Sequence, residues 1–336
     1  MINYVRYVYN LDINKIEKIN NNYLICTDST HLYLVEVVNH DWINYMNILN
    51  QSLNTYYFFS YKFLRNVYGD IITKVGDKNY VLMDVMNDYN TSIDLMENLD
   101  FYRVSNNYLK SNNYRYVNNW ISLWESKIDY LKAFSNKNNV SDIRIQPFFY
   151  YYVGLCSSLI NYLKKTDSLY GYSIKDQISL CHRRIDIPIT KLQFFNSVDY
   201  RVDLSVRDIG EYISSLYYDG SDFVNELNYY LKVSNLTPYS AAHLFARIIY
   251  PSIFLDYYEN KSKTLFSEKL FDIDSYEKFM KKTYEIINSY VNIPIIEWLK
   301  VWNNDSFYFW NFFFDHFFNA IIYCFILHNT VLTCSS

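Results

Sequence analysis

One segment of the sequence gathers the residue types that acid–base and metal chemistry require. His182, Arg183 and Arg184 follow an apolar run, and three aspartates come after them at positions 199, 203 and 208. A carboxylate can accept the proton of a substrate hydroxyl or hold a magnesium ion, and phosphoryl transfer uses both actions. This segment is therefore the candidate site, and the elements around it must position it.

The composition indicates a folded chain. Its 336 residues are 50% hydrophobic and 20% charged, which favours a globular protein of two domains or lobes over a disordered one. The net charge of -4, without a basic stripe, argues against a nucleic-acid partner. The 38 tyrosines and 23 phenylalanines, with abundant Asn, Ile and Lys, indicate an AT-rich bacterial genome; an aromatic carbohydrate-binding surface is the alternative. The 6 glycines form no glycine-rich phosphate loop.

Cysteine usage and the N-terminus bear on the compartment. The five cysteines are scattered without CxxC spacing, which argues against a zinc site or a disulfide framework. Residues 1–18 lack the apolar core of a signal peptide. We therefore expect the chain to stay inside the cell that makes it.

Residues 1–90 are predicted to be rich in strands. Residues 23–28 and 31–38 carry β-forming runs on either side of a turn. A short helix is expected over residues 42–53, and further strands over 63–68 and 80–85. These elements predict a small antiparallel sheet with one helix.

From about residue 90 the pattern becomes helical. One helical face is predicted to carry Trp120, Trp124, Ile128 and Leu131. Pro147 opens a run that is apolar nearly all round, as expected of a central buried helix. Later signals are a Thr237 cap, a kink at Pro251, a capping box of Asp274 with Glu277, and an insert of two strands near 182–200.

Six segments, in the same order, resemble a known family. They are NNWISLWESKIDYLKAF (118–134), PFFYYYVGLCSSLINYLKKTD (147–167), ISLCHRRIDI (178–187), VDYRVDLSVRDIGEYISSLY (198–217), AAHLFARIIYPSIFLDYYE (241–259) and VNIPIIEWL (291–299). The chain resembles the spore-coat kinase-like proteins of the YutH type, within the aminoglycoside phosphotransferase and choline kinase-like superfamily. The resemblance implies an α+β, bilobal, protein-kinase-like fold. We expect a small β-rich N-terminal lobe over residues 1–90, a larger helical C-terminal lobe over 91–302, and a separate aromatic tail over 303–336.

The resemblance also assigns roles to positions, and most of them carry the wrong residue for an enzyme. The lysine that anchors the nucleotide falls at Val35 or Glu36, and its glutamate partner is missing because residues 39–55 contain no Glu. Arg184 takes the place of the catalytic carboxylate, and a guanidinium only donates hydrogen bonds. The metal-binding Asn falls on Ile189.

Two carboxylates remain at magnesium-type, cofactor-binding positions, Asp199 and Asp208, and Asp199 is the candidate metal ligand. His182 is expected to orient the degenerate loop by bonding a backbone carbonyl. Asp186 is the candidate for a displaced base. Arg184 is expected to form an ion pair with Asp199 or Asp208; an anion site open to solvent is the alternative.

The tail over residues 307–327, FYFWNFFFDHFFNAIIYCFIL, is long enough to span a bilayer, yet polar residues interrupt it. Four interpretations stay open: an aromatic helix that packs or buries a partner, an interfacial membrane helix, a true span, and an anomalous extension of the reading frame.

The leading hypothesis for the function is a degenerate kinase-like protein, a pseudokinase, with a structural or interaction role. It would be cytoplasmic, or in the spore coat if the organism sporulates, with other proteins as partners and no cofactor. One alternative is a divergent ATP-dependent phosphotransferase that acts on a small hydroxyl substrate with Mg²⁺. The other is a nucleotide-binding regulator without turnover. A peripheral membrane contact through Phe307–Leu327 is a further alternative for the location.

Overall fold

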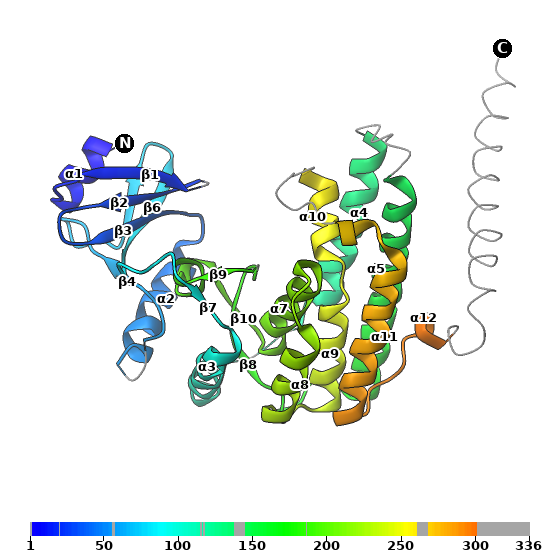
Figure 1. Cartoon of the computed structure of the whole chain (residues 1–336). Coiled ribbons are helices and arrows are strands. Elements are labelled where there is room, and N and C mark those ends of the chain that lie inside the picture. Colours follow the sequence, from blue (N-terminus) through cyan, green and yellow to red (C-terminus); the bar gives the residue numbers. More distant parts are fainter. Residues whose placement is uncertain are drawn as a thin grey trace, which may run out of the picture. The chain divides into compact units, whose positions relative to one another are not determined.

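An antiparallel sheet is the main feature of the N-terminal part of the chain (Figure 1). The computed structural model describes residues 2–19, 21–55, 58–114, 116, 118–137, 145–185, 187–260 and 268–300. The strand order is β1-β2-β3-β6-β4, and β5 pairs with β6. The strands are β1 (Lys15–Ile19), β2 (Asn22–Cys26), β3 (His31–Val37), β4 (Lys62–Leu64), β5 (Ile72–Val75) and β6 (Lys78–Val85). The predicted antiparallel sheet is confirmed.

The first element is a helix that the sequence reading missed. α1 (Ile2–Tyr9) lies in a stretch predicted as part of the strand-rich region, because its valines and tyrosines favour strands. Val5 and Val8 lie three residues apart and so share one helical face, which packs on Leu32 and Leu34 of the sheet. Burial of this face outweighs the weak local preference.

The opposite face of the sheet is set by the strand period. Because Leu32 and Leu34 of β3 face α1, Tyr33 and Val35 point to the other side. The predicted short helix is confirmed as α2 (His40–Leu53). Its N-cap is Asn39, whose side chain accepts a hydrogen bond from the Trp42 backbone N–H at 3.0 Å.

The chain then forms the elements that carry the candidate site. These are β7 (Ser92–Ile93), η1 (Met96–Asn98), α3 (Leu99–Ser111), β8 (Ile178–His182), β9 (Ile189–Thr190), α6 (Lys191–Phe194), η2 (Ser197–Asp199), β10 (Tyr200–Leu204), α7 (Val206–Asp219), α8 (Phe223–Val233) and α9 (Pro238–Ile248). β8 and β10 pair antiparallel, with His182 opposite Tyr200. The expected two-stranded insert near 182–200 is therefore replaced by two pairs, β8 with β10 and β7 with β9.

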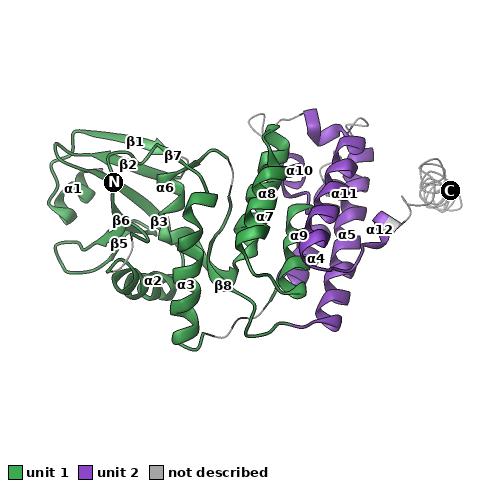
Figure 2. Ribbon diagram, turned by 60° about the horizontal axis from the view of Figure 1, so that its bottom comes forward, with its two compact units in different colours: residues 1–119, 172–249 green, residues 120–171, 250–336 purple. Residues whose placement is uncertain are grey.

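Two compact units divide the chain (Figure 2). One comprises residues 1–119 and 172–249, and the other 120–171 and 250–336. The expected boundaries at residues 90 and 302 stay predictions. The described part of the second unit contains α4 (Trp120–Lys137), α5 (Gln146–Leu169), α10 (Ser252–Asn260), η4 (Glu268–Phe271), α11 (Ile273–Tyr290) and α12 (Glu297–Lys300).

The predicted apolar face of α4 is confirmed, while one predicted helix start is wrong. All four residues predicted for the buried face of α4 are buried. Thr237 caps α9 by accepting from the Ser240 backbone N–H at 3.1 Å. α11 is capped by Asp272, whose side chain accepts from the Ser275 backbone N–H at 2.9 Å, and not by Asp274. Pro251 separates α9 from α10, so the predicted kink is a break.

Candidate functional site

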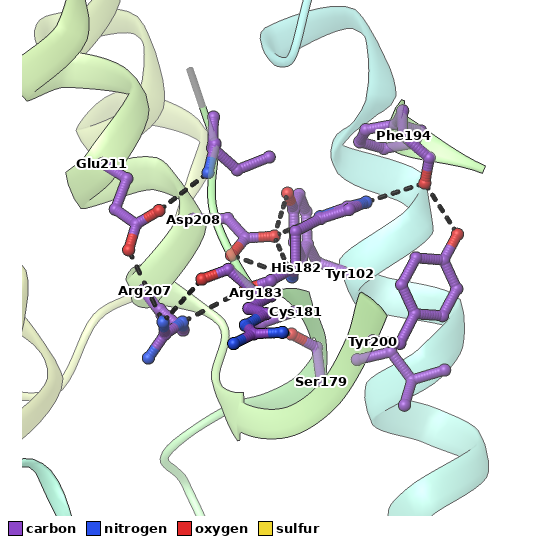
Figure 3. Close-up of polar contacts among 12 residues, drawn as sticks. Tyr102, Ser179, Cys181, His182, Arg183, Phe194, Tyr200, Arg207, Asp208 and Glu211 are labelled. Atoms are coloured by element: carbon purple, nitrogen blue, oxygen red, sulfur yellow. Dashed lines mark hydrogen bonds and ion pairs between the residues drawn. The ribbon is translucent and has the colours of Figure 1, made fainter. Parts of the chain in front are cut away.

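The centre of the site is a buried pair of side chains at the end of β8 and the start of α7. The His182 Nδ1 atom lies 2.6 Å from Asp208 Oδ2, and the His182 backbone N–H donates to both carboxylate oxygens at 3.1 and 2.9 Å. The Tyr102 hydroxyl donates to the same carboxylate at 3.0 Å (Figure 3). Asp208 has no exposed surface and lies in the first turn of α7, where the helix dipole favours a negative charge.

Both ring nitrogens of His182 face acceptor atoms. Its Nε2 atom lies 2.7 Å from the Phe194 carbonyl oxygen, and a carbonyl only accepts. Nδ1 faces a carboxylate that already accepts backbone N–H bonds, so both ring nitrogens lie in positions suited to donate. The predicted bond from His182 to a backbone carbonyl is therefore present. The Tyr200 hydroxyl also donates to this carbonyl at 2.8 Å.

Arg207 holds the backbone of the loop after His182 (Figure 3). Its guanidinium donates to the carbonyl oxygens of His182 at 3.3 Å and Arg183 at 3.2 Å. It also pairs with Asp203 at 3.1 Å and Glu211 at 3.5 Å. Burial lowers the pKa of Arg207, but the carboxylates of Glu211 and Asp203 outweigh that effect and raise it. The guanidinium is thus a fixed positive charge inside the loop.

Glu211 is the second anchor of this network. Its Oε2 atom accepts the Ile185 backbone N–H at 2.8 Å, and its Oε1 atom pairs with Arg247 of α9. Burial raises the pKa of Glu211, but the guanidiniums of Arg247, Arg207 and Arg184 hold it below its ordinary value. Arg184 therefore acts on a buried carboxylate of α7. That Arg184 pairs with Asp199 or Asp208 stays a prediction.

Asp199 lies at the end of η2 and is exposed. Its Oδ2 atom accepts from Asn196 Nδ2 at 2.8 Å. Protein atoms around the carboxyl displace water and raise the pKa of Asp199, whereas Arg183, His182 and Arg201 oppose this effect. Burial lowers the pKa of the Arg201 guanidinium, and the positive charges of Arg207 and Arg183 lower it further. The Nε atom of Arg201 is buried without a partner among the described residues. Two guanidiniums thus act on one carboxylate.

The remaining sequence-predicted positions lie apart from this network. Val35 is buried in β3, and Glu36, on the α1 face, pairs with Lys78 at 2.6 Å. Ile189 is buried in β9, opposite Ile93 of β7. Asp186 lies outside the described residues, so its role as a displaced base stays a prediction.

The sequence did not predict three side chains of this network: Tyr102, Glu211 and Arg247. Glu211 had a signal, because Arg207 and Glu211 are spaced four apart and so lie on one face of α7, whereas Asp203 belongs to β10. Tyr102 is 106 residues from Asp208, and Arg247 is 36 from Glu211. No local pattern reveals such contacts. In the described ranges, no group of three or more His, Cys, Asp or Glu side chains is arranged to hold a metal ion.

The fold is that of the kinase-like phosphotransferases. An aminoglycoside phosphotransferase from Alicyclobacillus acidocaldarius subsp. acidocaldarius DSM 446 superimposes with a TM-score of 0.50 at 12% identity, over 84% of this chain and 92% of that one. A microcompartment-associated aminopropanol kinase does so with a TM-score of 0.52 at 11% identity, over 85% and 94%. At this identity the likeness shows the fold alone.

The chain belongs to the family described as "Spore coat putative kinase YutH", whose model matches residues 3–291. A relative is the "Endospore coat-associated protein YutH" of Bacillus subtilis (strain 168), which is 26% identical over 210 residues. This match spans 54% of the chain and 62% of the relative. Among the described residues, no helix combines the length and the apolar character that crossing a membrane requires. The tail over 307–327 lies outside the described residues.

Proposed function

We propose that this chain is a catalytically inactive kinase-like protein with a structural or interaction role in the spore coat. The observation that carries the proposal is the position of Arg184. It stands where the family's enzymes carry the catalytic carboxylate, and its charge acts on the buried Glu211. A guanidinium in that place accepts no proton, so the ordinary base is missing.

The carboxylates that remain do not suit a magnesium–nucleotide complex. Asp208 accepts four hydrogen bonds from His182 and Tyr102, which use its lone pairs within the protein. Asp199 feels the positive charges of Arg183 and Arg201, which would repel a divalent cation. These surroundings support a protein that works without a metal or a nucleotide.

The strand that should anchor the nucleotide supports the same proposal. Val35 offers no charge for the phosphates, and Glu36 carries the wrong sign and is paired with Lys78. The helix that follows supplies no Glu. The expected lysine is missing from β3, the glutamate from α2 and the carboxylate from the loop. Loss of the reaction explains all three changes more simply than a single substitution in an active enzyme does.

A nucleotide titration tests the proposal. We expect the melting temperature of the full chain to stay within about 1 °C when ATP or GTP is added with Mg²⁺, because a ligand raises it only by binding the native state. A mass-spectrometric assay of hydroxyl-bearing small molecules with ATP should show no phosphorylated product.

Two outcomes would overturn the proposal, and they differ. A phosphorylated product that is lost in Asp199→Ala but kept in Asp274→Ala, a matched exposed aspartate of α11, would identify a divergent phosphotransferase. A melting shift without product would identify a nucleotide-binding regulator.

The coat assignment rests on the family and on the printed name of the relative. We expect a fluorescent fusion of this chain to collect at the spore surface in sporulating cells, through contacts with coat proteins. The Asp199→Asn fusion should behave in the same way, because the role needs no catalysis. A fusion that stays dispersed in the mother cell would contradict the coat assignment while leaving the nucleotide results untouched.

A further inference from the structure

An exposed aromatic surface lies where the turn after β4 meets the end of α1. Tyr7 is 70% exposed, Tyr68 67% and Val67 54%. The Val67 backbone N–H donates to the Val8 carbonyl of α1 at 2.8 Å, so the turn rests on the helix. The pKa of Tyr68 is raised, chiefly by its repulsion from Tyr7, so the two hydroxyls are neighbours. We call this surface the tyrosine patch, and its members are Tyr4, Arg6, Tyr7, Arg65, Val67 and Tyr68.

The turn of the tyrosine patch is held in one conformation by its own hydrogen bonds. The Asn66 Oδ1 atom accepts the backbone N–H groups of Tyr68 at 3.0 Å and Asp70 at 2.9 Å. The Arg65 guanidinium donates to the Gly69 carbonyl at 2.7 Å. Turn tips are ordinarily polar, because their side chains face water. A fixed turn that holds large apolar side chains in solvent is typical of an interaction surface.

The residue types and the charge of the patch indicate an acidic protein surface as its partner. Tyr and Arg are enriched among the residues that contribute most of the binding energy in protein interfaces. Arg6 and Arg65 form no ion pair in the described part of the chain, and their guanidiniums donate to backbone carbonyl oxygens instead. α1 carries no carboxylate, and Asp70 of the turn offsets only one of the two positive charges, so the patch has a net positive charge.

The outer side of α8 has the complementary character. We call it the α8 stripe; its members, spaced four, three and four residues apart and so on one side of the helix, are Asp222, Glu226, Tyr229 and Val233. Tyr229 is 50% exposed and Val233 55%, so the stripe offers apolar area at one end and acidic groups at the other. Lys232, the basic residue of α8, follows Glu226 by six residues and so lies on a different side of the helix.

The carboxylates at the start of the α8 stripe repel one another and a third acid beside them. Burial raises the pKa of Glu226, and the negative charges of Asp94 and Asp222 raise it further. Among the described residues, none of these three carboxylates forms an ion pair, and they are not arranged to hold a metal ion. A guanidinium supplied by another molecule would relieve the repulsion between them.

We propose that the tyrosine patch of one copy of this chain binds the α8 stripe of a second copy. The guanidiniums of the patch meet Asp222 and Glu226, and its aromatic rings pack on Tyr229 and Val233. Each surface supplies what the other lacks, because the patch has unpaired positive charges and the stripe has unpaired negative ones. A second copy is the occupant because one chain carries both surfaces.

The two surfaces belong to the same compact unit but to different elements, α1 with its neighbouring turn and α8 (Figure 2). A contact between different surfaces is heterologous, so it leaves one patch and one stripe free at the ends of a pair. Further copies therefore add head to tail. Such assembly deepens the proposed structural role, and its place in the coat rests on that role; the association itself is a property of the purified chain.

Sedimentation velocity of the full chain, from about 1 to 100 µM and with EDTA present, tests the proposal. We expect the weight-average sedimentation coefficient to rise with concentration, with a dissociation constant of about 10–100 µM for each contact, because surfaces this small bind weakly. A rise in NaCl from about 50 to 500 mM should weaken the contact by about fivefold or more, since salt screens exposed charges. Association through apolar groups alone would not weaken in this way. The chelator excludes association bridged by a metal ion.

Charge exchange assigns the contact to the two surfaces. Arg65→Glu and Glu226→Arg should each weaken the association by about tenfold or more, because like charges then face each other. The double variant should recover to within about threefold of the original affinity, because opposite charges meet again. Arg65→Glu also loses the hydrogen bond to the Gly69 carbonyl, so thermal melting checks its folding, and Glu226→Arg keeps the test decisive if that variant fails to fold.

An aromatic variant tests the apolar half of the contact. Tyr7→Ala should weaken the association by about tenfold or more, as expected of a tyrosine at the centre of an interface. Tyr150→Ala removes an exposed tyrosine of α5 that belongs to neither surface, and it should leave the dissociation constant unchanged.

Four results would overturn the proposal. They are a chain that stays monomeric at about 100 µM, a dimer that persists in Glu226→Arg, association that neither salt nor the charge variants weaken, and a double variant that does not recover although both single variants fold. The third result would locate the contact in another apolar segment, such as residues 307–327. None of the four bears on the nucleotide titration or on the fluorescent fusion.

Discussion

At the scale of single residues, the candidate site centres on His182, and the proposed loss of the base rests on Arg184. His182 is held at both ring nitrogens, by Asp208 and by the Phe194 carbonyl. These contacts give it a structural role in the loop. Such a pair is costly to bury and is stable only when every donor and acceptor is matched. Loss of the Asp208 carboxylate should therefore change the stability of the protein, which can be measured without any assay of activity.

Asp208→Asn should destabilise the protein strongly. The amide keeps the shape of Asp208 but removes the buried acceptor charge beside His182 and Tyr102, and it turns one acceptor into a donor. We expect a loss of about 3–5 kcal/mol in the free energy of unfolding, measured by urea denaturation. Asp199→Asn, at an exposed carboxylate, should change it by no more than about 0.5 kcal/mol. Equal effects of the two substitutions would contradict the described pair.

A second buried histidine predicts how stability depends on pH. His243 has no exposed surface; its Nδ1 atom donates to the Tyr239 carbonyl at 2.9 Å, and its Nε2 atom accepts from Asn118 Nδ2 at 2.8 Å. Burial lowers the pKa of His243 to about 4, from about 6.5 in the unfolded chain. As the pH falls below 6.5, the unfolded state takes up this proton first, so the native state loses stability until the pH reaches about 4.

At pH 5 this loss is roughly 2 kcal/mol relative to pH 7.5. His243→Asn keeps a donor for the Tyr239 carbonyl but cannot titrate. Urea denaturation at the two pH values should therefore show a difference between pH 7.5 and pH 5 that is smaller in the variant, whatever its absolute stability. A variant with the full dependence would show that other groups cause it.

At the scale of elements, the sequence predicted what local pattern controls. The strands around residues 23–38, the helix α2 and the buried face of α4 follow from periodicity and β preference. α1 was missed because its residues favour strands and only packing on the sheet makes it helical. The cap of α11 was placed two residues late because Asp272 and Asp274 carry the same signal.

The sequence predicted only some of the residues of the candidate site. The loop and its aspartates were visible as residue types, and the spacing placed them near one another. Arg247 and Tyr102 were not visible, because their contacts depend on how α9 and α3 pack. Neither helix carries a motif for the contact, and only tertiary structure brings these side chains to the loop.

The contact between α7 and α9 depends on one glycine. A Cβ atom on Gly210 would lie 2.7 Å from both Cβ and Cγ of Arg247, so the helices must separate to accept it. We expect Gly210→Ala to cost about 1–3 kcal/mol by thermal or urea denaturation, even though alanine favours helices. Ser214→Ala, one turn later at a buried hydroxyl without a described partner, should be neutral or stabilising. A neutral Gly210→Ala would show that the helices do not approach so closely.

At the scale of the whole molecule, the three positions on which the proposed inactivity rests lie on separate elements. Val35 belongs to β3, Arg184 to the loop after β8, and Ile189 to β9. Val35 and Ile189 are buried in strands, whereas Arg184 is half-buried in a loop, so the three positions have different surroundings. If the proposal of an inactive protein holds, changing one of these positions does not supply a reaction that needs all of them.

Arg184→Asp therefore should not create a kinase. The new carboxylate supplies a base, but β3 still lacks a lysine and β9 still lacks a metal ligand, so phosphorylated product in the mass-spectrometric assay should stay at background. The same change replaces a cation that stabilises Glu211 with a like charge, so the free energy of unfolding should fall by about 1–2 kcal/mol. Arg183→Asp, at the exposed neighbour, should cost less. Product formed by Arg184→Asp, and lost when Asp199→Asn is added, would mean that the rest of the site is competent and that only the base had been lost.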